Sequence, residues 1–141
     1  MLDTNAAGIQ VNSLVSVQAP LAGTCVCTAA NTNYSAPTSQ VLVPTQTRGA
    51  RLTKVTALTL ASVSAACELQ LFASADGGTT KRFIDSNLMP VTSVAQTAKQ
   101  TKIDFGYSDT TPLILLAGES LYAAIGSAQT GIVFRAEGGS Y

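Results

Sequence analysis

The chain has 141 residues, a length typical of one domain with a sizeable hydrophobic core. Charged residues make up 11% of the chain, whereas an ordinary soluble domain has about 25%. The eight basic and eight acidic residues cancel to a formal net charge of +0, which excludes the strongly basic surface of a nucleic-acid-binding protein and weakens repulsion between copies. We therefore expect a single domain, residues 1–141, that associates with other chains.

The sequence also indicates where in the cell the protein is made. No run approaches the roughly 20 apolar residues that a membrane-spanning helix needs, so we expect no membrane partner. The first residues, MLDTNAAGIQV, have neither a basic region nor a continuous apolar region, and a signal peptide is therefore not expected. We expect the protein to be made in a cytoplasm.

The first residues of the chain alternate between apolar and polar. Ile9, Val11, Val15 and Val17 fall in one phase, before Pro20 and Gly23, which we expect to end the pattern. Residues 1–20 are predicted to form either the first strand of the domain or an extended N-terminal arm. Such an arm would pair with a neighbouring protein by strand addition.

The next segments also predict strands separated by loops. TCVCTAA, residues 24–30, is a short β-like run, and NTNYSAPTS, residues 31–39, has the composition of a loop. VLVPT and ARLTKVTALTLA are rich in β-branched residues and are separated by the polar QTRG. We predict a strand for each of the two.

The clearest hairpin spans residues 66–84. Cys67, Leu69 and Leu71 alternate with polar residues, and Asp76-Gly77-Gly78 supplies the turn. After it, VAQTAKQTKIDF, residues 94–105, alternates again, and its threonines favour a strand over a short helix.

Residues 112–126, PLILLAGESLYAAIG, predict a second hairpin. Gly118-Glu119 fits a type II′ turn, with glycine at the first central position. Residues 113–116 are apolar in both phases, so both faces of that strand require cover. We predict that these strands pack between chains through Leu113, Ile114, Leu116, Leu121, Tyr122 and Ile125.

GIVFRAEGG, residues 131–139, predicts the last strand. Eight or so short strands with no convincing amphipathic helix predict an all-β fold, an antiparallel β-sandwich or jelly roll.

Residues that could carry chemistry are sparse. Histidine is absent from the sequence, which removes the usual general base and imidazole metal ligand. The acidic residues are scattered, and only a glycosidase-like pair among them would support catalysis. Cys25, Cys27 and Cys67 are too few for a zinc site and are interpreted as small buried side chains. We expect no enzyme activity, no metal and no cofactor.

Two further groups of side chains have alternative interpretations. Arg48, Arg51 and Lys54 cluster at a strand start and are either solvated or dock against an acidic partner surface. Aromatic residues make up 6% of the chain without tryptophan, so stacking platforms for sugars or single strands are not favoured. Tyr34, Tyr107 and Tyr141 are the aromatic candidates in loops.

Three stretches resemble small structural proteins of tailed bacteriophages and prophages. They are CELQLFASADGGTTKRFIDSNLM, TKIDFGYSDTTPLILLAGESLYAAIG and the ending GIVFRAEGGSY, which together cover about the last half of the chain. The resemblance implies a virion protein, assembled in the host cytoplasm, that decorates the phage head as a trimer bound to the major capsid protein. In that role Ile9, Val11, Arg48 and Arg51 are candidate capsid contacts. The alternative is a tail, fibre or head-spike module that recognises sugars on the host surface.

Overall fold

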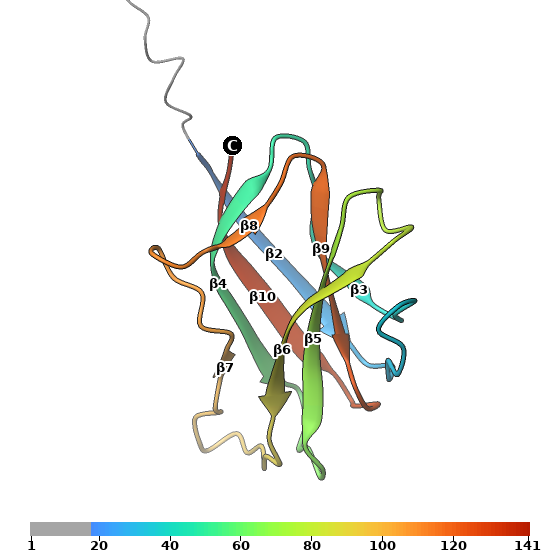
Figure 1. The fold of residues 1–141 in the computed structure, drawn as a ribbon. Helices are drawn as coiled ribbons and strands as arrows, with labels where there is room; N and C mark the ends of the chain where they lie inside the picture. Colours follow the sequence, from blue (N-terminus) through green and yellow to red (C-terminus); the bar gives the residue numbers. More distant parts are fainter. Residues whose placement is uncertain (1–17) are drawn as a thin grey trace, which may run out of the picture.

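The computed structural model describes residues 18–141 (Figure 1), so the predicted strand or arm over residues 1–17 lies outside the described residues. Within residues 18–141 the secondary structure is entirely β and contains no membrane-spanning helix. The strands are β2 (Ala19–Cys27), β3 (Gln40–Gln46), β4 (Ala50–Thr59), β5 (Cys67–Ser74), β6 (Arg82–Met89), β7 (Ile103–Asp104), β8 (Leu113–Leu115), β9 (Glu119–Ile125) and β10 (Ile132–Ser140).

These strands form two antiparallel sheets. The β10 sheet has the order β2-β10-β4-β7, with β8 also paired to β4, and the β5 sheet has the order β3-β9-β5-β6. The sheets face each other as two layers (Figure 1). The predicted all-β sandwich is confirmed, whereas jelly-roll connectivity stays a prediction.

The hydrophobic core lies between the two sheets. Alternate residues of each strand point inward, because successive side chains of a strand lie on opposite faces. The largest of them are fully buried and include Leu52 of β4, Leu69 and Leu71 of β5, and Phe134 of β10. Burying each such side chain contributes roughly 1.5–3 kcal/mol.

The predicted hairpin over residues 66–84 is confirmed. Strand β5 pairs with β6 from Cys67↔Met89 to Ala73↔Arg82. In the connecting turn, Gly77 and Gly78 have φ values of 73° and 98°, which only glycine adopts readily. Asp76 accepts hydrogen bonds from the Ser74 hydroxyl and from the backbone N–H of Thr80, so its side chain holds the turn closed.

The second predicted hairpin, residues 112–126, is wrong. Strand β8 pairs with β4, and β9 lies between β3 and β5. The chain therefore crosses from one sheet to the other, and both apolar segments contribute to one core. Gly118 does have a positive φ of 85°. However, the backbone N–H of Glu119 bonds to the Leu116 carbonyl, which places Gly118 at the third position of the turn, as in a type II turn.

Two other expectations also need correction. Pro20 and Gly23 lie inside β2. Among the strands within residues 18–141, β2 pairs with β10 alone and is an edge strand, which tolerates a proline. At Gly23 a Cβ would lie 2.0 Å from the Leu42 carbonyl oxygen, so the close approach of β2 and β3 requires glycine.

Of residues 94–105, only Ile103–Asp104 of β7 is strand. The preceding loop is held by the Gln100 side chain, which bonds both the N–H and the C=O of Thr59. A side chain thus supplies the bonds that a longer strand would have made.

Candidate functional site

The predicted interface residues divide between the surface and the core. Leu113 and Leu115 face inward, while Ile114 and Leu116 keep 46% and 65% of their surface exposed. The four consecutive apolar residues therefore have one face covered by the protein's own core. The other face is open in the single chain.

Three predicted interface residues do not join that open face. Leu121 and Ile125 are fully buried in the core of the single chain, so no partner chain can contact them without opening the sandwich. Tyr122 lies on the outer face of the β5 sheet, opposite Phe72 and Val41. The prediction is wrong for Leu121 and Ile125, because it assumed that β8 and β9 were paired neighbours, whereas the role of Tyr122 in an interface stays a prediction.

Arg48 and Arg51, predicted as capsid contacts, lie beside the exposed apolar pair. Arg51 is directly opposite Ile114 in the β4–β8 register. The turn that carries Arg48 packs against the segment after β8, since a Cβ at Gly49 would lie 2.6 Å from the Leu115 carbonyl oxygen. Two surfaces that the sequence analysis treated as separate are thus one.

The C-terminus completes this surface. The backbone N–H of Tyr141 bonds to the Gly49 carbonyl, and its side chain is exposed. We call Arg48, Arg51, Ile114, Leu116 and Tyr141 the β8 corner. It lies at the end of the sandwich where the last residues of β10 and the start of β2 meet (Figure 1). At this end Ser140 pairs with both Ala19 of β2 and Ala50 of β4. Ile9 and Val11 lie outside the described residues.

The two arginines of the β8 corner differ in their contacts. The Arg51 guanidinium donates to the Asp109 carbonyl, and its Nη1 lies 3.8 Å from the Asp109 carboxylate. The Asp109 side chain is 90% exposed, and such an exposed ion pair contributes little to stability. Arg48 is exposed in its turn. Both guanidinium groups can therefore reach an acidic partner surface.

Three of the scattered carboxylates share one hollow, and Glu119 lies elsewhere. Asp104, Asp109 and Glu137 line an open hollow of about 300 Å³, but Glu119 accepts a bond from Leu116 N–H in a turn on another part of the fold. The hydrogen bond from Arg135, 2.7 Å long, lowers the pKa of Glu137. Within residues 18–141, no cluster of three acidic or cysteine side chains is arranged to hold a metal ion.

All three cysteines are free thiols. Cys27 and Cys67 are buried and Cys25 is partly buried. The hydrogen bond between Cys25 and Cys27, together with burial, raises the pKa of the Cys27 thiol. Cys27 and Cys67 are therefore the small buried side chains that the sequence analysis expected, whereas Cys25 is partly exposed.

A second surface feature lies on the outer face of the β5 sheet, where residues 28–39 cross it. Phe72 is 0% exposed although it points away from the core. The ring of Phe83 lies 5.3 Å from that of Phe72, and Tyr34 stacks on Phe83 with ring centroids 4.5 Å apart. Three aromatic rings are thus layered between the sheet and the solvent.

Beside this aromatic stack is a chain of polar side chains. The Asn31 amide donates to Gln70 over 2.7 Å, and the Gln70 amide donates to the Glu68 carboxylate over 2.9 Å. The Tyr34 hydroxyl donates to the same Glu68 oxygen. These four residues, with Gly126 and Ser127, line an open cleft of about 280 Å³, which we call the Tyr34 cleft.

The sequence analysis named Tyr34 as a loop aromatic but missed its neighbours. Phe83 and Glu68 occupy ordinary strand positions, and no local motif links them to residue 34. The only signal available was the loop composition of residues 31–39.

Comparisons with known proteins bring no relative: no family model, no curated protein and no solved structure matches the chain.

Proposed function

We propose that the protein is a non-enzymatic virion structural protein that binds the outside of a phage head as an oligomer and stabilises it. The observation that carries this proposal is the β8 corner, where exposed apolar side chains and two guanidinium groups are grouped at one end of a rigid sandwich. The resemblance of the last half of the chain to phage structural proteins supports the same role.

The chemistry of the β8 corner fits contacts between copies and with a shell. Ile114 and Leu116 present apolar area, and each Å² removed from water contributes about 25 cal/mol before association costs. Arg48 and Arg51 suit the acidic rim of a capsid protein, the proposed partner. A trimer is the proposed oligomer, following the resemblance.

The proposed mechanism is mechanical. A decoration protein is present in many copies, and each copy makes a modest contact across a junction between capsid subunits. Because these contacts act together, their combined strength greatly exceeds the strength of any single one. The shell thereby resists the pressure of packaged DNA without any catalytic step.

The experiment combines light scattering of the purified full-length chain with imaging of undecorated capsids mixed with it. An oligomer at regular lattice positions supports the proposal. Ile114→Asp and Leu116→Asp should reduce the oligomer to monomers, and Arg48→Glu should weaken capsid binding while the oligomer persists.

The matched control is Val91→Asp. Val91 and Leu116 are equally exposed, at 65%, but Val91 lies outside the β8 corner, in the segment after β6. An unchanged oligomer in Ile114→Asp would remove the β8 corner from the interface. A monomer that ignores capsids but attaches to host cells would favour the tail, fibre or head-spike alternative.

A further inference from the structure

We propose that the Tyr34 cleft binds a neutral carbohydrate, with one sugar ring against Tyr34 and its hydroxyl groups on Glu68. A pyranose has an apolar face of C–H groups and a rim of hydroxyls. The cleft offers the complement of both, because an aromatic ring adjoins carboxylate and amide groups within one hollow. The proposal goes beyond a role on the phage head and does not depend on it.

The aromatic part of the site remains accessible. Tyr34 keeps 49% of its surface exposed although its ring is stacked on Phe83. Phe83 is supported in turn by the buried Phe72. An exposed ring fixed in this way presents apolar surface at low entropic cost, as tyrosines do in many binding sites.

The polar part has acceptor capacity left for a ligand. Tyr34 and Gln70 both donate to Oε1 of Glu68, and a carboxylate can accept about four hydrogen bonds over its two oxygens. The second oxygen is therefore suited to ligand hydroxyl groups. The Tyr34 hydroxyl holds Glu68 by its hydrogen bond, which also raises the pKa of Tyr34.

The loop that carries Tyr34 is held by hydrogen bonds of its own. The Asn31 side chain accepts bonds from the N–H groups of Asn33 and Thr38, and Asn33 accepts from Ser35 and Ala36. The backbone N–H of Asn31 also bonds to the Ile125 carbonyl over 2.7 Å. A ligand would thus bind a loop that is already ordered, which avoids a large part of the usual entropic cost.

Size and charge narrow the class of ligand. A volume of about 280 Å³ is slightly below that of small-molecule sites, which run from roughly 300 to 1,000 Å³, so the cleft suits no more than one sugar ring. The Glu68 carboxylate disfavours an anionic sugar, because like charges in a partly desolvated cleft repel. A neutral hexose or N-acetylhexosamine is the expected ligand.

The test is an NMR titration of the isotope-labelled full-length chain with glucose, galactose, mannose and N-acetylglucosamine. We expect at least one sugar to give saturable amide shifts in residues 31–36, 66–70 and 126–127. Glycerol, which has hydroxyls but no ring, should not saturate, and glucuronic acid should bind more weakly than glucose. Absence of saturable binding by every neutral sugar, or shifts that map elsewhere, would overturn the proposal.

Variants assign the binding to named groups. Tyr34→Ala should abolish saturation, and Glu68→Gln, which keeps the shape of the side chain, should weaken binding about tenfold. The controls are Tyr107→Phe and Glu137→Gln, a tyrosine hydroxyl and a carboxylate outside both the cleft and the β8 corner, and both should leave binding unchanged. If Tyr34→Ala and Glu68→Gln both bind as the original chain does, the cleft is not the site.

A second titration distinguishes a sugar that is part of a surface glycan from a free sugar. Tighter binding of an oligosaccharide than of its monosaccharide indicates a surface glycan, whereas equal affinities indicate a free sugar. The titration uses no capsid, so its failure leaves head binding intact. Conversely, failure to bind capsids leaves the sugar site intact.

Discussion

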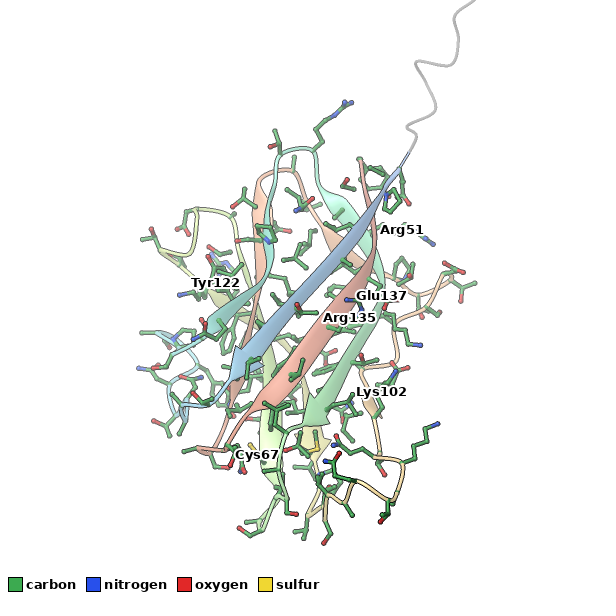
Figure 2. The ribbon with its side chains drawn as sticks, turned by 180° about the vertical axis from the view of Figure 1, so that it is seen from behind. Arg51, Cys67, Lys102, Tyr122, Arg135 and Glu137 are labelled. Carbon is green, nitrogen blue, oxygen red and sulfur yellow. The ribbon has the colours of Figure 1, made fainter. Side chains whose placement is uncertain are left out.

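The outer faces of the two sheets differ in what covers them. On the β10 sheet, Arg135 and Glu137 of the central strand are exposed and form an ion pair (Figure 2). On the β5 sheet, Gln70 and Phe72 of the equivalent central position are 1% and 0% exposed. The difference comes from residues 28–39, whose Asn31 and Tyr34 contact the β5 sheet. A loop can thus turn the outer face of a sheet into a second small core with an open cleft at its edge.

The largest expected effect on either outer face is that of Phe72→Ala. Truncating a fully buried phenylalanine should lower the free energy of unfolding by about 3–5 kcal/mol. The matched change on the other outer face, Val133→Ala, should cost about 1 kcal/mol or less. Urea denaturation of the two variants measures both, and equal losses would mean that residues 28–39 do not shield Phe72.

The next largest effect concerns the buried polar side chains beneath residues 28–39. Asn31→Ala leaves the side-chain carbonyl oxygen of the buried Gln70 without its hydrogen-bond donor. An unsatisfied buried group costs about 1–3 kcal/mol. The double variant Asn31→Ala with Gln70→Ala should lose less than the sum of the single changes, because the two groups are partners. Additive losses in the double-mutant cycle would contradict the pairing.

A smaller effect is expected beside Phe72 on the same face, where Tyr122 is its cross-strand neighbour. The Lys81 ammonium lies 4.8 Å from the centre of the Tyr122 ring, and such an exposed cation–π contact contributes about 0.5–1 kcal/mol. Lys81→Met keeps the length of the side chain and removes the charge, so it should cost that amount. Lys99→Met, on a loop of the other sheet, is the control and should leave thermal stability unchanged.

The smallest effect belongs to the uncovered face. Arg135 lowers the pKa of Glu137, so the ion pair stabilises the folded chain above the unfolded carboxyl pKa of about 4.3 and loses this contribution as the pH falls through the lower folded pKa. Arg135→Ala should therefore cost less than about 1 kcal/mol at neutral pH. High salt should reduce that loss further, and a loss that persists in high salt would argue against an exposed pair.

Local patterns were sufficient to predict much of the fold. The alternation of Cys67, Leu69 and Leu71 with polar residues, and the Asp76-Gly77-Gly78 turn, predicted the β5–β6 hairpin correctly. The positive φ of Gly118 was also predictable, since glycine readily adopts it. The exposure of Ile114 was not, because four apolar residues in a row do not show which two face inward.

Strand pairing and the two surface sites depended on contacts between residues far apart in the sequence. Apart from β5–β6 and β7–β8, each connection joins strands of opposite sheets, so Leu113 and Leu121 are close in sequence but belong to different layers. The Arg48-Gly49 turn packs against the segment after β8, and Tyr34 bonds to Glu68, only once the chain has folded. Alternation and turn chemistry act within a few residues and therefore specify strands and turns, whereas pairing order and surface sites follow from the burial of all strands in one common core.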